Sequence, residues 1–186
     1  ADYAFFQHII ASLAPKSGRC AILWPHGVLF RDAEEEMRRK LIDADLIECV
    51  VGLGMNLFYN SSMPSCIVIC RTSKPKARRG KILLINAVNE VTRERAQSFL
   101  THSHISRIIA AYDRFSDEPH FAKVVTLDEV RRNGWSLNLP IYVVPEAPVP
   151  ANGESAKTDK IPRAIESWIR SRVDLAKSLQ SLLGVT

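Results

Sequence analysis

The sequence has no apolar run long enough to span a membrane and no basic stretch ahead of its first apolar residues. A membrane-spanning helix needs roughly 20 apolar residues, and a secretory signal peptide begins with a basic segment. We therefore expect no membrane partner and a cytoplasmic protein. With 46% hydrophobic and 24% charged residues, the composition is that of an ordinary globular protein and excludes disorder throughout the chain.

The motifs of several common enzyme classes are also absent: there is no P-loop, no G-x-S-x-G, no H-E-x-x-H and no G-x-G-x-x-G. Gly52-x-Gly54 is half of a dinucleotide motif, but an irregular loop follows it where that motif requires a helix. His102 and His104 lie two residues apart in a predicted helix, so their rings point to different sides. We expect no cofactor site at these glycines and no metal site at these histidines.

Only four cysteines are present, and all of them lie in or beside apolar runs: Cys20, Cys49, Cys66 and Cys70. The last two are spaced C-x-x-x-C, without a second Cys or His pair at zinc spacing. The pattern indicates small buried hydrophobic side chains in a reducing compartment. We expect no metal.

Charge is nearly balanced, with 25 Lys and Arg against 20 Asp and Glu and a net charge of +5. The excess is concentrated in one basic segment, which contains Lys74, Lys76, Arg78, Arg79 and Lys81. Such a cluster is typical of contacts with nucleic-acid phosphates. The other interpretation, which composition alone favours, is a solvated loop between two strands.

Hydrophobic periodicity in the first hundred residues alternates between helices and strands. We expect helices at 2–13 and, after a cap at Asp32, at 34–43, and strands at 19–24, 46–53, 65–71 and 81–87. The runs at 46–53 and 65–71 are almost continuously apolar, as in strands buried on both faces. This order of elements predicts an α/β sheet.

The second half of the chain predicts a helix from Thr101 with apolar positions at Ile105, Ile108, Ile109, Tyr112 and Phe115. A capping box of Thr126 and Glu129 then predicts a short helix, and an extended segment follows. We expect residues 101–144 to close the domain, 145–160 to form a Pro-rich linker and 161–186 to form a last helix. The apolar stripe of that helix contains Ile165, Trp168, Ile169, Val173, Leu179 and Leu183. It suits either a partner helix or docking onto its own domain.

Several stretches of residues 1–144 occur in an order found in one known family. They are Asp2-Tyr3-Ala4-Phe5 through Ile9, Trp24-Pro25-His26-Gly27-Val28-Leu29-Phe30-Arg31, Asp45-Leu46-Ile47-Glu48, Asn56-Leu57-Phe58-Tyr59, Met63-Pro64-Ser65-Cys66-Ile67, and Leu137-Asn138-Leu139-Pro140 with Tyr142. Together they resemble the adenine-specific DNA methyltransferase subunit of type I restriction-modification systems.

The resemblance implies a Rossmann-like sheet that binds S-adenosylmethionine and methylates the exocyclic amino group of an adenine flipped out of DNA. In the family, the Gly-rich cofactor motif and the Asn/Asp-Pro-Pro-aromatic motif precede the position of Asp2, and this sequence contains neither. The resemblance therefore implies that this sequence corresponds to the C-terminal part of the subunit only. Residues 1–100 would be the second half of the catalytic domain, with strands 19–24, 46–53 and 65–71 as its last three and the final pair antiparallel. A helical C-terminal extension follows. The cofactor site and the catalytic motif would lie outside this chain, which alone would be inactive.

The resemblance also implies roles for residues of this chain. Phe58 would stack on the flipped base with Tyr59 behind it, and His26 and Gly27 would line the floor of the pocket. The alternative for Phe58 is packing in the core. Ile141 stands where the family pattern has an Arg, so any contact made by that Arg is in doubt here.

The family implies three partners: DNA, a DNA-specificity subunit that the helix 161–186 would contact, and a restriction subunit. A homodimer of the chain through an exposed sheet edge is a further expectation. Two other interpretations are a non-catalytic nucleic-acid or protein binding module and a solitary DNA adenine methyltransferase. The module predicts a sheet with covered edges, whereas half of an enzyme predicts apolar surface exposed along strand 19–24.

Overall fold

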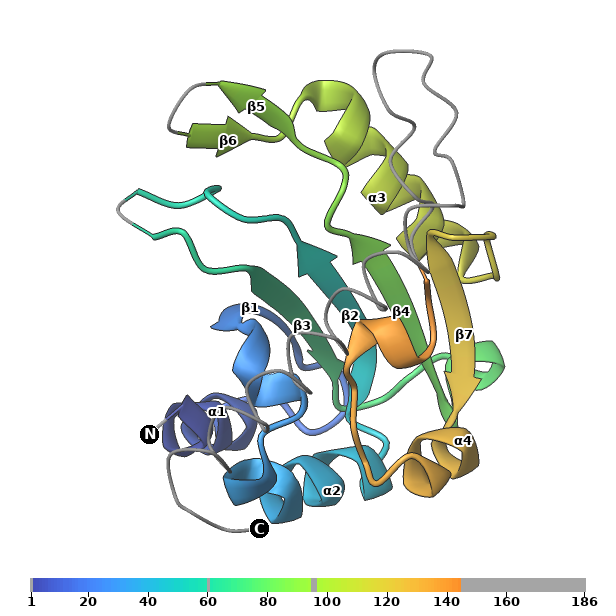
Figure 1. Ribbon diagram of the computed structural model, residues 1–186. Coiled ribbons are helices and arrows are strands. Elements are labelled where there is room, and N and C mark those ends of the chain that lie inside the picture. The colour runs from blue at the N-terminus through green and yellow to red at the C-terminus, as the bar shows by residue number, and fades with distance from the viewer. Residues whose placement is uncertain (1, 60, 95–96, 145–186) are drawn as a thin grey trace, which may run out of the picture. The chain divides into compact units, whose positions relative to one another are not determined.

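A computed structural model of the chain describes residues 2–59, 61–94 and 97–144 (Figure 1). The helices are α1 (Asp2–Ala11), α2 (Glu35–Asp43), α3 (His102–Arg114) and α4 (Leu127–Arg132). The strands are β1 (Arg19–Pro25), β2 (Ile47–Leu53), β3 (Ser65–Arg71), β4 (Lys81–Ala87), β5 (Thr92–Glu94), β6 (Gln97–Phe99) and β7 (Ala122–Thr126). Short 3-10 turns are η1 (His26–Leu29), η2 (Asp32–Glu34), η3 (Lys76–Arg78) and η4 (Leu139–Ile141). The predicted linker 145–160 and partner helix 161–186 lie outside the described residues.

The main sheet is mixed and has the strand order β1-β3-β2-β4-β7 (Figure 1). Strand β3 is antiparallel to both β1 and β2, β2 and β4 are parallel, and β7 is antiparallel to β4. The carboxyl ends of β1, β2 and β4 therefore lie at the same end of the sheet. We call this end of the strands the carboxyl edge. The start of β3 lies at the same edge. The strands expected at 19–24, 46–53, 65–71 and 81–87 are confirmed, as is the antiparallel pairing of β2 with β3. The expectation that 65–71 is the last strand of the sheet is wrong, because β4 and β7 follow it in the chain and join the same sheet.

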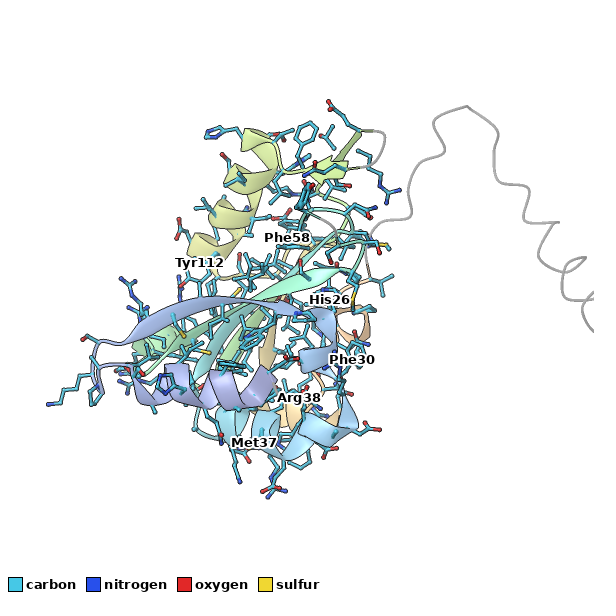
Figure 2. All side chains as sticks on the ribbon, turned by 90° about the vertical axis from the view of Figure 1, so that its left-hand side faces the viewer. His26, Phe30, Met37, Arg38, Phe58 and Tyr112 are labelled. Carbon is cyan, nitrogen blue, oxygen red and sulfur yellow. The ribbon has the colours of Figure 1, made fainter. Side chains whose placement is uncertain are left out.

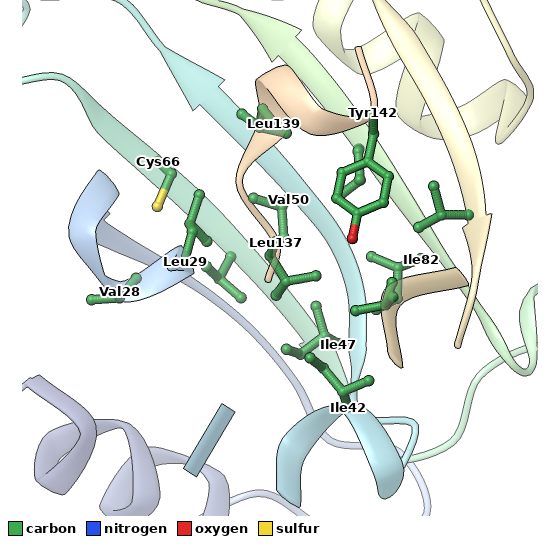
Figure 3. Close-up of a cluster of buried hydrophobic side chains, with 14 of the residues drawn as sticks. Val28, Leu29, Ile42, Ile47, Val50, Cys66, Ile82, Leu137, Leu139 and Tyr142 are labelled. Carbon is green, nitrogen blue, oxygen red and sulfur yellow. The ribbon is translucent and has the colours of Figure 1, made fainter. Parts of the chain in front are cut away.

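The central strand β2 is buried over its whole length, as its continuous apolar run predicts. One of its faces contributes Ile47 and Val50 to a cluster under α1, α2 and the segment 137–143, drawn in Figure 3. The other face contributes Cys49 and Val51 to a cluster under α3. Burying a side chain of this size stabilises the fold by about 1.5–3 kcal/mol. The result is an α/β fold with a core on both faces of one sheet.

Helices α1 and α2 anchor the turn η1 that follows β1. The Tyr3 hydroxyl donates a hydrogen bond to the Val28 carbonyl (3.1 Å), and burial raises the pKa of Tyr3 to about 12. The guanidinium of Arg38 is buried and donates to the carbonyls of Val28 in η1 (3.4 Å), Arg31 (3.1 Å) and Trp135 (2.8 Å). Buried polar groups of this kind need their hydrogen bonds, so these contacts hold η1 in one position.

Two local expectations are wrong, those for Asp32 and for the segment 137–144, and α3 buries fewer apolar positions than its pattern offers. Asp32 does not cap α2: it lies in η2, and α2 begins at Glu35 without a side-chain cap. Ile105 and Ile109 of α3 face solvent, with 41% and 53% exposure, because the sheet takes only the side of α3 that carries Ile108, Tyr112 and Phe115. The segment expected to be extended turns instead through η4, where Leu139 packs into the core.

The ends of the short helices follow the expected capping chemistry in most respects. Thr101 caps α3 by accepting from the His104 amide (3.4 Å), and the His104 ring accepts from the Thr101 amide (3.2 Å), so this histidine is a helix-start residue. Thr126 accepts from the Glu129 amide (3.2 Å), but the Glu129 carboxylate pairs with Lys123 (2.7 Å) and does not complete the capping box.

Candidate functional site

The loops that follow β1 and β2 meet at the carboxyl edge of the sheet. The His26 amide, at the end of β1, donates to the Pro64 carbonyl (3.4 Å), at the end of the loop 54–64. The contact arises because β3 is antiparallel to both strands, so that Ser65 lies opposite Pro25 and Leu53. The topology thus brings His26 and the segment that carries Phe58 to the same end of the sheet, as Figure 2 shows.

The loop 54–64, which we call the Phe58 loop, presents two aromatic side chains at its tip. The Phe58 carbonyl accepts from the Ser61 amide (3.1 Å), which joins these two residues at the tip. Phe58 is 38% exposed and Tyr59 is 86% exposed, and neither belongs to a core cluster. Met55 and Met63 of the same loop are exposed as well, and exposed apolar side chains that gather in one segment are typical of a binding surface.

The hairpin of β5 and β6 supports the base of the Phe58 loop. The Ser98 amide donates to the Asn56 carbonyl (2.8 Å), and Asn56 has the left-handed backbone conformation (φ 59°). A Cβ on Gly54 would lie 2.7 Å from the Val88 carbonyl oxygen and 2.8 Å from a methyl carbon of Val91. Only glycine allows this close approach, so the loop leaves β2 in a defined direction. The sequence did not predict this support, because each strand of the hairpin is only three residues long.

His26 is half-buried beside Gly52, the glycine near the end of β2. A Cβ on Gly52 would clash with Leu139 and would lie 3.3 Å from His26 Nε2. Burial lowers the pKa of His26, opposed by a hydrogen bond to the Ser65 backbone, so the ring is neutral at neutral pH. Nε2 is buried and has no hydrogen-bond partner among the described residues. The ring is thus held beside the end of β2.

Gly27 lies beneath a surface arginine. A Cβ at this position would clash with the guanidinium of Arg31, which is half-exposed and pairs with Asp2 (3.3 Å) and Glu34 (3.7 Å). The end of a flexible side chain can move aside, so the space at Gly27 is set by how firmly these carboxylates hold Arg31. The predicted floor residues therefore share one turn, His26–Leu29, with the arginine covering Gly27.

The basic segment connects the end of β3 to the start of β4. It therefore lies at the end of the strands opposite the carboxyl edge, which we call the opposite edge. Strand β3 has seven residues, which separates the two edges by roughly 20 Å at about 3.3 Å per residue. The expectation that Lys74 contacts phosphate is not supported: its side chain is 1% exposed, and Nζ donates to Asp45 (2.6 Å) and the Lys81 carbonyl (2.7 Å).

Arg78 is also drawn inward. Its guanidinium pairs with Glu48 (3.4 Å), donates to the Asp113 carbonyl (3.1 Å) and lies 4.5 Å from the ring centre of Phe115. The Glu48 side chain is fully buried and also receives Arg71 (3.3 Å) and the Tyr112 hydroxyl (2.8 Å). Burial and this hydrogen bond to Glu48 raise the pKa of Tyr112. Lys74 and Arg78 are therefore structural, and only Lys76, Arg79 and Lys81 of the basic segment face solvent.

Strand β1 forms one side of the sheet. Among the described strands it pairs with β3 alone, and Leu23 on it is 46% exposed. Unpaired edge strands offer free backbone donors and acceptors to another strand. Within the described residues, β1 is thus an edge strand that carries one exposed apolar side chain.

The described part of the chain offers few other candidate sites. No helix in it combines the length and the hydropathy that crossing a membrane requires. Residues 2–59, 61–94 and 97–144 contain no group of three or more His, Cys, Asp or Glu side chains suited to a metal. One surface pocket is lined by residues of the segments 117–123 and 142–144, and no predicted site residue lines it.

Comparisons with known proteins match this arrangement. The N-6 DNA Methylase family matches residues 1–148. The type I restriction enzyme MjaVIII methylase subunit of Methanocaldococcus jannaschii is 40% identical over 149 residues, which is 78% of this chain and 25% of that protein. The MpnII methylase subunit of Mycoplasma pneumoniae is 29% identical over 182 residues, 97% of this chain and 32% of that protein.

A solved structure is similar as well. The type I restriction-modification methyltransferase subunit from Streptococcus thermophilus has a TM-score of 0.72 and 35% identity, over 77% of this chain and 30% of that one. The chain thus spans about a quarter to a third of the length of these relatives. On the family match and these identities, the chain belongs to the N-6 DNA Methylase family.

Proposed function

We propose that the chain is the C-terminal part of an adenine-specific DNA methyltransferase subunit of a type I restriction-modification system. The whole subunit transfers the methyl group of S-adenosylmethionine to the exocyclic amino group of an adenine flipped out of the duplex. Family membership supports the reaction class. The observation that carries the role of this chain is the Phe58 loop, which presents exposed aromatic side chains where β1 and β2 end.

In this proposal, Phe58 stacks on the flipped base. Its partial exposure and its absence from both core clusters favour stacking over core packing. A base stacked on an aromatic ring gains about 1–3 kcal/mol. That gain offsets part of the cost of unstacking the base from DNA. Tyr59, which is more exposed, extends the same surface.

His26 and Gly27 shape the pocket floor without transferring protons. Burial lowers the pKa of His26, which favours the neutral imidazole over the imidazolium that a general acid would need at neutral pH. Its amide holds the end of the Phe58 loop through Pro64, and its ring lies against Gly52. The two residues thus fix where the loop stands relative to the sheet.

The described residues do not fit S-adenosylmethionine itself. At Gly54, after β2, the Val88 carbonyl and the Val91 side chain fill the space beside the glycine, and at Gly27, after β1, the guanidinium of Arg31 occupies it unless it moves aside. A cofactor cradle needs glycines that leave room for the ligand in a turn from a strand into a helix. We therefore assign the cofactor site and the catalytic Asn/Asp-Pro-Pro-aromatic motif to a preceding part of the subunit, and expect this chain alone to be inactive.

The open edge at β1 supports the same division. We propose that a strand of the preceding part pairs with β1 and covers Leu23, which would complete a Rossmann-like sheet. When the chain is by itself, a second copy could take that edge, giving a homodimer. A self-sufficient binding module would instead cover its edge, so the observed edge favours the enzyme interpretation.

The proposed partners are DNA, a specificity subunit and a restriction subunit, which the relatives' type I methylase names support. The helix 161–186 is our candidate contact with the specificity subunit, although it lies outside the described residues. Truncation at Pro150 should then abolish assembly with the specificity subunit in a pull-down, and retained assembly would contradict the assignment.

Reconstitution tests the proposed function. The chain is combined with a preceding part that carries both motifs and with the specificity subunit, and transfer of labelled methyl groups to adenine N6 is measured. We expect transfer only when all three are present. Transfer without the specificity subunit would instead identify a solitary methyltransferase. The chain alone, shown to be folded by circular dichroism, should release no binding heat with S-adenosylmethionine, and tight binding would contradict our placement of the cofactor site.

A further inference from the structure

Two of the four cysteines lie directly opposite each other across the pair of strands β1 and β3. The register places Cys20 opposite Cys70. Both contact the same core cluster, so their side chains lie on the same face of the sheet. Cys49, Cys66 and Cys70 are buried as the sequence predicts, but Cys20 is only partly buried and is reachable from solvent.

The register favours a bond between these two residues. Residues directly opposite in an antiparallel pair have Cα atoms about 4.5–5.5 Å apart. Disulfide-bonded cysteines have Cα atoms about 4.4–6.8 Å apart. Neither of the other cysteines faces a thiol: Cys66 lies opposite Trp24 and Gly52, and Cys49 lies opposite Ile69 and Leu83.

The surroundings make Cys20 the more reactive of the two thiols. The neighbouring Cys70 lowers the pKa of Cys20 to about 7, against the opposing effect of burial. The same contact, together with burial, raises the pKa of Cys70. Because the thiolate is the nucleophile, an accessible thiol with a lowered pKa reacts first and the buried one second.

We propose that Cys20 and Cys70 form a dithiol modification site that low-molecular-weight disulfides oxidise to an intramolecular disulfide. The Cys20 thiolate attacks one sulfur of oxidised glutathione, forming a mixed disulfide and releasing one glutathione thiolate. Cys70 then loses its proton and attacks the Cys20 sulfur, releasing the second glutathione thiolate. The protein loses two electrons and two protons, and the small disulfide becomes two thiols.

The bond would fasten the edge strand β1 to β3. Opposite Cβ atoms in antiparallel pairs are about 4.5–5.5 Å apart, slightly more than the 3.5–4.5 Å usual in disulfides. Closure therefore draws β1 toward β3. In the chain by itself, β1 pairs with β3 alone among the described strands, so no other pairing among those strands opposes the movement. Strained, accessible disulfides of this type are readily reduced again, so the modification would be reversible.

The test uses the reduced 186-residue chain incubated with oxidised glutathione at neutral pH. We expect two of the four thiols to disappear, the intact mass to fall by two hydrogen atoms, and reducing agent to restore both. Trypsin should then yield the peptides 20–31 and 41–71 linked together. Since 41–71 contains three cysteines, variants identify the partner.

The matched pair of variants is Cys70→Ala and Cys66→Ala, which both remove a buried thiol from β3. Cys70→Ala should leave Cys20 as a stable glutathione adduct, whereas Cys66→Ala should still form the cross-link. Cys20→Ser, which replaces a partly exposed side chain, should abolish the reaction without disturbing the core. A stable glutathione adduct on the unaltered chain, a cross-link that survives Cys70→Ala, or oxidation only in denaturant would each overturn the proposal.

Discussion

The carboxyl edge and the opposite edge differ in whether their aromatic and charged side chains face solvent or pair with other groups of the chain. At the carboxyl edge, Phe58 and Tyr59 are exposed, and His26 has a buried ring nitrogen without a described partner. At the opposite edge, the segment richest in cations turns two of them inward, where Lys74 pairs with Asp45 and Arg78 pairs with Glu48.

This difference teaches that a cluster of cations need not be a binding surface. Burying a charge without a partner costs several kcal/mol, so acidic partners at Asp45 and Glu48 fix the inward orientation of Lys74 and Arg78. The edge with few charges retains the surface that a ligand can reach. Breaking the ion pairs of the opposite edge should therefore lower the stability of the fold. Altering the carboxyl edge should instead weaken binding of the target base and slow the reaction.

The largest expected effect is at the opposite edge, where Glu48 forms buried ion pairs. Glu48→Ala removes the buried acceptor of Arg71, Arg78 and Tyr112, and should lower the free energy of unfolding by about 3 kcal/mol, measured by urea denaturation. Glu36→Ala, which removes an exposed carboxylate paired with Lys40 on α2, is the control and should leave the midpoint unchanged. Equal effects of the two variants would show that the buried cluster adds no stability.

A smaller effect is expected at the base of the Phe58 loop. Asn56→Val places a β-branched side chain in the left-handed conformation and should destabilise the chain by about 1–2 kcal/mol. Asn56→Gly accepts the same conformation without strain and should stay close to the unaltered chain. Urea denaturation compares the two. If valine and glycine behave alike, the loop does not depend on the conformation that Ser98 holds.

The smallest effect is a pH dependence at His26. Because its folded pKa lies below the unfolded value of 6.5, the unfolded chain binds the proton more readily. The stability that His26 contributes is thus present above pH 6.5 and is lost as the pH falls through the lower folded pKa. His26→Gln should flatten this part of the stability profile between pH 7.5 and 5.5, whereas His8→Gln, which changes an exposed ring, should not. An unchanged slope in His26→Gln would exclude the burial of a neutral ring.

The sequence was most informative where local pattern and burial coincide. The apolar run of β2 and its neighbour β3 predicted two central strands, and the end of β2 correctly placed the irregular loop that carries Phe58. Thr101 correctly marked the start of α3. These features depend on residues that are close together in the chain, which is why periodicity and capping rules detect them.

What the sequence could not supply are partners far apart in the chain. Lys74 and Arg78 look like surface charges until Asp45 and Glu48, about 30 residues earlier, are seen beside them. The β5–β6 hairpin has three-residue strands, and its role depends on the contact between Ser98 and Asn56. Such pairings are tertiary, and no local pattern contains them.

The central claim is that the carboxyl edge, and not the basic segment, acts on the target base. In the reconstituted subunit, Phe58→Ala should lower the rate of methyl transfer by about fivefold to 150-fold, from the loss of about 1–3 kcal/mol of stacking. Phe30→Ala, which removes another partly exposed aromatic ring, controls for folding.

The decisive comparison is with Lys76→Ala, Arg79→Ala and Lys81→Ala combined, which remove the solvent-facing cations at the opposite edge. Our account predicts that this triple variant transfers methyl groups at the rate of the unaltered subunit while Phe58→Ala is slow. A slow triple variant together with an unaffected Phe58→Ala would contradict it.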